Sequence, residues 1–587
     1  MSYPTPCQGF VRSVAPGILD SLIGALVIMF ITAPVWATSW SLGPDYSNHL
    51  WLVDQLQRSL SGIDSVPETV SSDPTGVLYP HFVFYGGSLY LAVAVVARII
   101  GTDIAFALSF PVAMMVGYLA LFRIGRLVGL SRLWCHVGPI VFTTLLFRLT
   151  VMYAGGAWGE FVAPVGVLLL YWAGLRAVLR YPHGWTFMLA VTGEAWLSAG
   201  HGITLVWGNA IVALSLIVFV AGGVLFPSLR RRFVSWAVFR GLATCVVGMT
   251  LGLMINAWWV VPAVLLRTSL RVSDYFMNVQ TISTSVMYSD LGNVLSLVPR
   301  DPVTTDLPNL YVQLPTAAIC FSIGVLGVSL VRPKLRVAGL LVSVACLVVM
   351  LGIYVLNTGR GWEYMPSILR IIQFPHRAWT YAGIAAAILV IGACTTANRP
   401  DITGRIRGIA AVGALSLCII SLSIAIQVAW SSGSHDSLAR YTATRGEALN
   451  WYDPGLFRNR FEPGDEIAVN TLTFEPSGED RAEWSGSVAG QESHLTNIAL
   501  PRALFRAENA TLEGYDTDGF AVLRPIDGNK PIRVWLERGE WVAASVWVSR
   551  AAGGLSLLIL AVLLVRAIGG KVKAPGLWRR ARLTRVG

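Results

Sequence analysis

Residues 18–40 read ILDSLIGALVIMFITAPVWATSW, an apolar run in which Asp20 is the only charged residue. A transmembrane helix needs ~20 residues to cross a hydrocarbon layer of about 30 Å, so this run is long enough to span a membrane. It is too long for the hydrophobic core of a signal peptide, and no small-residue cleavage site stands near its end. We therefore expect a membrane helix that stays in the mature protein.

The composition of the whole chain agrees with a membrane protein. The 587 residues are 54% hydrophobic and 13% charged, with a mean hydropathy of +0.61. Such a composition excludes a soluble globule with a solvated surface. Further crossings are expected at about 104–123, 133–151, 161–179, 185–199, 203–225, 239–264, 314–331, 336–356, 377–396, 408–430 and 547–569. The predicted fold class is an α-helical polytopic membrane protein with about 12–13 transmembrane helices.

The orientation of these helices follows from Arg and Lys, which concentrate in short loops on the cytoplasmic side. Basic clusters recur at 123–132, 176–180, 230–240, 332–336, 399–407 and 571–585. They all face the cytoplasm, together with both termini, if a further apolar segment at 82–100 does not cross completely. Pro80 and the Gly86-Gly87 pair suit a broken, partly embedded segment. We therefore predict a long first outer loop at about 41–103; the alternative is an ordinary helix with a shifted topology.

The region 431–546 differs from the rest of the chain in charge. It holds 11 basic and 18 acidic residues and none of the seven cysteines, so no disulfide framework is expected there. Short β-like runs at Glu466–Phe474, Ala482–Val488, Phe520–Leu523 and Ile532–Leu536 predict a small β-sandwich-like extracytoplasmic domain. The predicted domains are a membrane domain (1–430), this β-rich domain (431–546), and the last transmembrane helix with a basic tail (547–587). The basic balance of the remainder reflects topology, and no nucleic-acid partner is expected.

Ionisable side chains near hydrocarbon cost roughly 2.5–3.5 kcal/mol each at the bilayer centre on insertion scales, so each is a functional candidate. Asp45 and His49 stand four residues apart, just beyond the first apolar run. Glu160 follows three glycines in Gly155-Gly156-Ala157-Trp158-Gly159, which place it at the head of the next helix. There it gains from the helix dipole but needs a cation or hydrogen bonds to stay charged. The alternative is a helix-capping role for Glu160.

Two further outer segments carry candidate residues. Glu194 and His201 share a helical face if the helix continues through Gly200; if it ends there, His201 lies in an outer turn, where it can touch a head group or a metal. A His bonded to a backbone carbonyl and a protonated, packed Glu194 are the alternatives. Arg370 and Arg377 face outward against the usual bias, which indicates an anionic partner. Arg377 is the best phosphate ligand, and snorkelling to lipid is its alternative role.

The order of these features resembles the GT-C superfamily of integral-membrane glycosyltransferases, and within it the YfhO-type bacterial membrane proteins. The resemblance covers most of the chain and is carried by Asp45 and His49 after the first helix, Tyr79-Pro80 with Phe84-Tyr85-Gly86-Gly87, Gly155 to Glu160 against a Gly-Ala-x-x-Glu motif, Ser198 to His201, and Gln373-Phe374-Pro375-His376-Arg377 against Gln-Phe-Pro-x-Arg. Trp158 and Gly159 are expected to enlarge and loosen the Gly-Ala-x-x-Glu turn, and His376 replaces the usual aromatic residue. The expected fold is therefore GT-C-like.

The resemblance implies transfer of a sugar from a polyprenyl-phosphate donor to a cell-envelope glycan or lipid acceptor on the extracytoplasmic side. Asp45 would be the base of an inverting displacement, with His49 orienting Asp45 or the acceptor. Phosphate binding is expected from Arg377, His376, Gln373, Tyr85 and Arg370. Glu160, with His201, is expected to hold a divalent cation, Mg²⁺ or Mn²⁺.

The expected partners are the polyprenyl-phosphate sugar donor, a glycan or glycolipid acceptor and membrane lipids. Only 4 of the 44 basic residues are Lys, a bias that favours a GC-rich bacterium and thus a bacterial plasma membrane. Two other functions are open. A lipid-linked sugar flippase or transporter needs charges along a path across the membrane, whereas Arg148 and Glu194 are almost the only deep charges. A non-catalytic sugar-binding or assembly subunit would use the acidic outer domain as its binding module.

Overall fold

The computed structural model describes a large part of the chain. The described residues are 6–37, 44–60, 70–71, 78–79, 87–179, 183–225, 235–265, 316–330, 344, 346–353, 375–398, 404–432, 475–477, 483–486, 491–496, 498, 502, 505–515, 521–536 and 540–572. Within them, eight helices are long and apolar enough to cross a membrane, or nine if one bent pair is a single span. The fold class of a mostly helical, multi-pass membrane protein with a small strand-rich region is therefore confirmed; the remaining expected crossings fall wholly or partly outside the described residues or on shorter helices.

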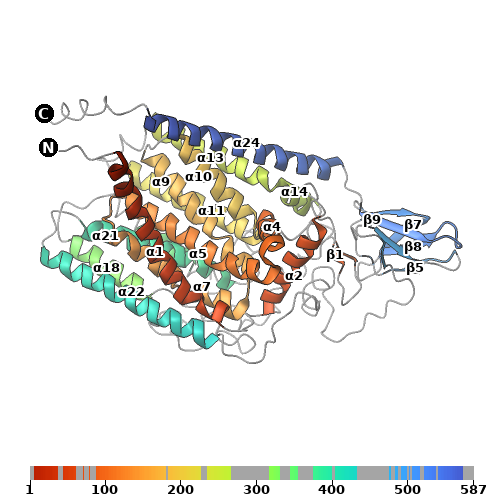
Figure 1. Ribbon diagram of the computed structural model, residues 1–587, viewed down its shortest axis with the longest axis horizontal. Helices are drawn as coiled ribbons and strands as arrows, with labels where there is room; N and C mark the ends of the chain where they lie inside the picture. The colour runs from red at the N-terminus through yellow and green to blue at the C-terminus, as the bar shows by residue number, and fades with distance from the viewer. Residues whose placement is uncertain are drawn as a thin grey trace.

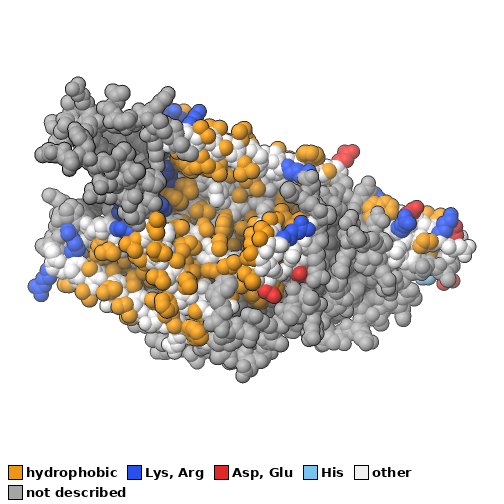
Figure 2. Space-filling view, viewed as in Figure 1, with side chains coloured by type: hydrophobic (Ala, Val, Ile, Leu, Met, Phe, Trp, Pro, Cys, Tyr) orange, Lys and Arg blue, Asp and Glu red, His pale blue; other side chains and the backbone are white. Residues whose placement is uncertain are grey.

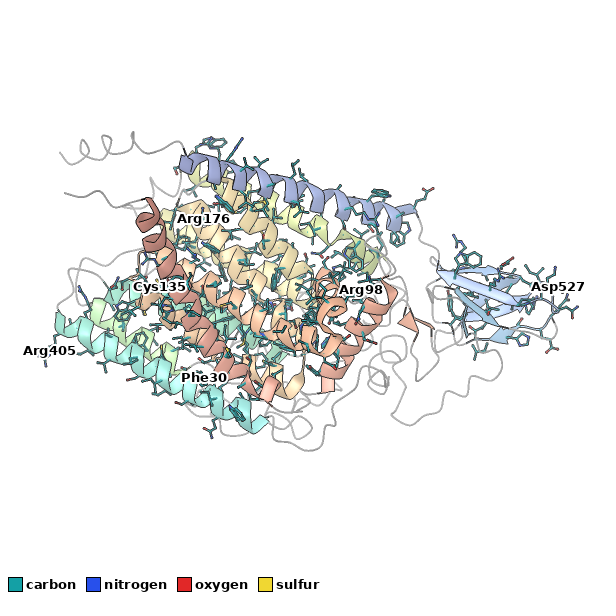
Figure 3. All side chains as sticks on the ribbon, viewed as in Figure 1. Phe30, Arg98, Cys135, Arg176, Arg405 and Asp527 are labelled. Carbon is teal, nitrogen blue, oxygen red and sulfur yellow. The ribbon has the colours of Figure 1, made fainter. Side chains whose placement is uncertain are left out.

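The long helices lie side by side in one bundle, and the C-terminal strands lie beyond one end of it (Figure 1). α1 (Pro6–Ala37) begins and α24 (Glu540–Val572) ends at the other end. Arg176 and Arg405, from two of the basic clusters, lie at that same end, whereas Asp527 lies in the strand region (Figure 3). Two basic clusters and the outer ends of α1 and α24 therefore lie on the side of the bundle away from the strands.

The other elements of the bundle follow in chain order. They are α2 (Pro44–Ser59), α4 (Ser88–Ile100), α5 (Thr102–Leu127), η1 (Trp134–His136), α6 (Val137–Thr143), α7 (Leu146–Thr150), the π-helix η2 (Val151–Gly155), α8 (Trp158–Val162), α9 (Val165–Val178), α10 (His183–Ser198), α11 (Gly202–Leu225), α13 (Trp236–Ile255), α14 (Ala257–Leu265), α18 (Thr316–Leu330), η5 (Pro375–Ala378), α21 (Trp379–Ala397) and α22 (Gly404–Ser432). A short two-stranded ribbon is formed by β1 (Val70–Ser71) and β2 (Leu78–Tyr79).

The helices differ in how much of their surface the protein itself covers. Of the most apolar window, 89% is buried in α21, against 22% in α22 and 17% in α24. Exposed apolar side chains cover much of the bundle surface in Figure 2. So large an apolar surface marks contact with lipid, so the outer helices face the membrane and α21 forms the core. The short helix η5 leads directly into α21, which fixes η5 to the most buried helix.

Glycines let three central helices approach closely. A Cβ atom on Gly166 of α9 would lie 2.6 Å from the backbone oxygen of Gly193 in α10, and one on Gly252 of α13 would lie 2.5 Å from that of Val191. Small residues at helix contacts are how membrane helices gain van der Waals packing without a hydrophobic driving force. α10 is thereby held between α9 and α13, which fixes the turn that follows it.

The helices α2 and α4 lie at the end of the bundle nearest to the strands (Figure 1). α4 has 13 residues, a length of about 20 Å, which is too short to cross the hydrocarbon. At Gly101 the backbone takes φ 90°, a value that favours glycine, and turns into α5. This short helix agrees with the prediction that 82–100 does not cross completely; residues 80–86 lie outside the described part.

The crossing expected at 133–151 is broken. The helical segments Trp134–Thr143 and Leu146–Tyr153 meet at an angle of 44°. At the break, the hydroxyls of Thr143 and Thr144 donate to the carbonyl of Ile140 at 3.0 and 2.7 Å. Hydroxyl groups of this kind satisfy backbone oxygens that a break in a membrane helix exposes. Beyond the break, α7 continues into η2 and ends at Gly156, whose φ is 66°.

The strand region consists of two antiparallel sheets with strand orders β3-β4-β9-β6 and β5-β8-β7. The strands are β3 (Glu475–Ser477), β4 (Glu483–Gly486), β5 (His494–Leu495), β6 (Phe505–Glu508), β7 (Ala510–Tyr515), β8 (Ala521–Pro525) and β9 (Ile532–Leu536). Buried residues from both sheets, among them Phe505, Leu523 and Val534, form one small core, and Val542 from the first turn of α24 joins it. The last helix therefore starts inside the strand region.

Three of the predicted strands correspond to β4, β8 and β9, and the fourth, 466–474, lies outside the described residues. β3, β5, β6 and β7 were not predicted. In β7 the register against β8 shifts between Leu512 and Gly514, an irregularity that a pattern of alternating residues does not reveal. Strands of this kind depend on their cross-strand partners more than on their own pattern.

Candidate functional site

The helix α2 carries both residues that are predicted to be catalytic. Pro44 stands at its first position, where the missing N–H costs nothing because the first N–H groups of a helix have no partner within it. Asp45 follows, and His49 lies one turn further along. His49 is buried, with 5% of its surface exposed. The side chain of Asp45 lies outside the described part, so its role stays a prediction.

An aromatic cluster formed by α2, α4 and α8 holds His49. The hydroxyl of Tyr90 lies 2.6 Å from Nδ1 of His49. Trp158 packs against both, with ring centroids 4.3 Å from Tyr90 and 6.3 Å from His49. The indole N–H of Trp158 donates to Oγ of Ser109 at 2.6 Å. A hydrogen bond at Nδ1 fixes the ring orientation of a histidine, so Tyr90 sets the direction in which Nε2 points.

Glu160 and Arg377 form an ion pair between Oε1 and Nε. Glu160 lies in the first turn of α8, as predicted, and Arg377 lies in η5. Their side chains are 12% and 14% exposed. The N-cap of α8 is Ala157, and its backbone N–H donates to the oxygen of Val151, so Glu160 does not form a capping box. The anionic partner expected for Arg377 is thus a carboxylate of the protein.

His201 lies in the turn between α10 and α11, because α10 ends at Ser198. It is 7% exposed. Its Nδ1 lies 2.9 Å from Oγ1 of Thr204 and accepts the Thr204 backbone N–H at 3.4 Å. Burial lowers the pKa of His201 well below its usual value, and the nearby charges of Arg377 and His49 lower the pKa further. His201 is therefore a neutral imidazole whose proton is on Nε2.

Three consecutive residues of α8 connect these candidates. Trp158 packs on His49, Glu160 pairs with Arg377, and Gly159 lies against His201. The five-residue helix α8 thereby brings together side chains from α2, η5 and the α10–α11 turn. His49, Glu160, His201 and Arg377, which are far apart in the sequence, share one site.

The turn before Glu160 is tight, which corrects the expectation that Trp158 and Gly159 loosen it. Trp158 has 0% of its surface exposed, since its indole fills the space between Tyr90 and Phe106. A Cβ atom on Gly159 would lie 3.0 Å from the backbone oxygen of Gly200. Gly159 is needed for this close approach, and it allows the two outer turns to pack together.

The remaining predicted site residues are not placed with this group. Tyr85, Arg370 and Gln373 lie outside the described residues. His376 belongs to η5 and precedes Arg377, but its side chain lies outside the described part. Their phosphate-binding roles stay predictions.

The residues predicted to hold a divalent cation do not complete a metal site. Among the described residues, no group of three His, Cys, Asp or Glu side chains is placed to bind a metal ion. Glu160 already pairs with Arg377, and Nδ1 of His201 bonds to Thr204. The divalent cation therefore stays a prediction.

Sequence reasoning missed two residues that shape the site. Tyr90 lies in the apolar segment 82–100, where no pattern distinguishes it from its neighbours. Tyr381 of α21 donates its hydroxyl to the backbone oxygen of Thr204 at 3.4 Å and so ties α21 to the His201 turn. The sequence signal that could have identified them is a tyrosine within an apolar run, because a buried tyrosine hydroxyl usually finds a polar partner.

A scan of protein-family models and a search of curated protein sequences found no match. Among solved structures, the chain is similar to the crystal structure of the Archaeoglobus fulgidus oligosaccharyltransferase in the apo form, and to that of the same enzyme tethered via a disulfide bond to an acceptor peptide containing the NVT sequon. In both cases the sequence identity is 12%, the TM-score is 0.35, and the match covers 72% of this chain and 56% of that chain. The chain is thus distantly similar to oligosaccharyltransferases, and its function is inferred from the side chains of its own site.

Proposed function

We propose that the protein is a membrane glycosyltransferase of the GT-C type, similar to the YfhO-type proteins. It would move a sugar from a polyprenyl-phosphate donor to a cell-envelope glycan or lipid acceptor on the extracytoplasmic face of a bacterial plasma membrane. The observation that supports this proposal is the cluster around α8, in which Glu160, Arg377 and the imidazoles of His49 and His201 come together. Its helix α2 lies at the end of the bundle near the strand region (Figure 1). A cluster of an acid, a guanidinium and imidazoles suits chemistry on a lipid head group better than transport, which needs charges along a path across the membrane.

The proposed reaction is a direct displacement. The acceptor hydroxyl oxygen forms a bond to the anomeric carbon, while the bond from that carbon to the phosphate oxygen breaks and its electron pair leaves with the polyprenyl phosphate. Asp45 takes the acceptor proton, which typically contributes about 10²–10⁴-fold to the rate. One displacement inverts the anomeric configuration.

The ion pair supports a role for Arg377 in binding the donor phosphate. Glu160 holds the guanidinium at the head of α21 and balances its charge before the donor binds. Arg377 then stabilises the negative charge that develops on the departing phosphate, because guanidinium donors match phosphate oxygens. His49, oriented by Tyr90, would position Asp45 or the acceptor hydroxyl.

Purified protein in lipid nanodiscs, supplied with polyprenyl-phosphate pentoses and hexoses and envelope glycans, tests the proposal by mass analysis of products. We expect the wild type to consume one donor and D45N to be at least ~100-fold slower. Undiminished transfer by D45N would exclude Asp45 as the base. No donor consumption by the wild type would favour the non-catalytic alternative. Parallel reactions with EDTA test the divalent cation, whose removal should abolish transfer if Glu160 and His201 hold it.

A further inference from the structure

Arg148 is a buried charge that the proposed reaction does not use. It lies on α7, beyond the 44° bend of the broken span, and is 3% exposed. Among the described residues, none accepts a hydrogen bond from its Nε, Nη1 or Nη2. Two other arginines of the bundle have carboxylate partners: Arg377 pairs with Glu160, and Arg132 with Asp20. A buried guanidinium without such a partner is costly, and buried charges are normally paired.

The contacts of Arg148 are aromatic. Its Cζ lies over the ring of Phe142 at 4.6 Å from the centroid and over the ring of Phe161 at 4.1 Å. Cation–π contacts offset part of the cost of burying the charge. They supply no oxygen to the donors in the guanidinium plane, which match a carboxylate or a phosphate.

The two rings connect Arg148 to the candidate site. Phe142 belongs to α6, on the other side of the bend, and Phe161 follows Glu160 in α8. The chain from Arg148 to α8 passes through the π-helix η2 and Gly156, and Tyr153 of η2 is fixed to α1 by a hydrogen bond of 2.6 Å to the backbone oxygen of Ile31. Arg148 is therefore joined to α8 both through the chain, by way of η2, and through its contact with Phe161.

We propose that Arg148 is a second phosphate-binding residue, and that a polyprenyl phosphate supplies the phosphate. The ligand chemistry follows from the unbonded, planar guanidinium, and its source follows from the location, because Arg148 lies within a membrane span. Since Arg148 has little exposed surface, binding requires Phe142 and Phe161 to move apart. The chain changes direction on either side of Arg148, at the 44° bend and at Gly156, and these are the points where it could move. The identity of the lipid rests on the proposed function; the anion site does not.

Thermal unfolding of the full-length protein in detergent tests this inference. The probes are undecaprenyl phosphate, uncharged undecaprenol and inorganic phosphate. The variants are R148M, R148K and R98M; Arg98 is a control, because it is an exposed arginine in the last turn of another helix, α4. We expect the wild type to bind undecaprenyl phosphate at least ten-fold more tightly than undecaprenol. R98M should behave like the wild type. R148M should reduce the difference without abolishing it, because the phosphate site proposed at Arg377 remains, and R148K should be intermediate because it keeps the charge without the planar fork.

The melting temperature without ligand gives a second readout. R148M removes a charge without a hydrogen-bond partner, so it should melt at or above the wild-type temperature. A lower melting temperature together with an unchanged preference for undecaprenyl phosphate would show that Arg148 is a structural cation–π residue and overturn the proposal. A preference that R148M retains in full, at any melting temperature, would overturn it as well.

The remaining outcomes distinguish a lipid phosphate from a free phosphate ion, and they distinguish failure of this inference from failure of the proposed function. Stabilisation by inorganic phosphate that R148M loses would support the site with a free ion as its ligand. Sugar transfer without any Arg148-dependent binding would refute this inference alone. Arg148-dependent binding without sugar transfer would refute the proposed function alone.

Discussion

At the scale of single residues, two buried tyrosine–histidine pairs differ in where they lie. Tyr90 and His49 are 2.6 Å apart, and Tyr118 and His136 are 2.7 Å apart. Cys135, next to His136, lies toward the end of the bundle away from the strands, whereas Arg98, on the helix of Tyr90, lies toward the strand end (Figure 3). The same chemical contact thus occurs once at the candidate site and once remote from it.

The first prediction uses this pair of contacts. Y90F removes the hydrogen bond that orients His49, a loss of about 1 kcal/mol, and should slow sugar transfer about 5–10-fold. Y118F removes a similar bond beside His136, which lies outside the site, and should leave the rate unchanged. Initial rates with saturating donor measure both. Equal losses in the two variants would show a general effect on stability instead of a role for Tyr90.

The second prediction concerns the Glu160–Arg377 pair. Removing one partner of a buried ion pair leaves an uncompensated charge and typically costs 3–5 kcal/mol, so E160Q and R377Q should each lower stability strongly. The double variant should lose much less than the sum of the two, and it should still be inactive. Denaturant unfolding of the four proteins gives the coupling free energy. Additive losses would mean that the two side chains do not form a pair in the folded protein.

At the scale of elements, the helix α8 depends on how closely its neighbours approach. A Cβ atom on Gly87, which precedes α4, would lie 2.0 Å from the backbone oxygen of Ala199, the same oxygen that accepts the N–H of Leu89. The start of α4 is therefore fixed against the end of α10. This junction places Tyr90 and His201 on either side of α8.

The third prediction follows from that junction. G87A should push α4 away from α10, lower stability by about 1–3 kcal/mol and reduce transfer by displacing Tyr90. G553A on α24 is the matched control, because a Cβ there meets nothing within 4 Å and alanine favours the helix by roughly 1 kcal/mol. Melting temperatures and transfer rates measure both. A G87A protein as stable and active as the wild type would contradict the assigned packing.

The elements also show what sequence patterns can predict. Long apolar runs predicted the membrane helices, because crossing hydrocarbon requires a length that few other structures share. Glycines before Glu160 predicted its place at the head of a helix, because glycine allows the tight turn there. The pairing of Glu160 with Arg377 and the aromatic contact of Trp158 with His49 were not predictable, since they depend on tertiary packing between segments far apart in the chain.

At the scale of the whole molecule, two basic clusters lie away from the strands. Arg176 and Arg405 lie at one end of the bundle, and the strand region lies beyond the other (Figures 1 and 3). The apolar surface between the two ends, visible in Figure 2, is where lipid would cover the protein. This distribution favours a membrane orientation with the strand region outside.

The fourth prediction tests that orientation. In a cysteine-free background, S493C in the strand region should react with a membrane-impermeant maleimide in intact cells, because Ser493 is exposed. R405C, at the exposed start of α22, should react only after the membrane is permeabilised. Labelling is followed by gel shift. The reverse pattern would place the candidate site on the cytoplasmic side and would contradict transfer at the outer face.

The first turn of α24 packs in the core of the strand region through Val542, and the helix then runs for 33 residues, about 50 Å. On its way it meets α14, where the hydroxyl of Ser549 accepts the backbone N–H of Trp258 at 2.9 Å. The strand region and the last membrane helix thus share one core. We expect a bilayer thickness that changes the tilt of α24 to change the position of the strand region as well.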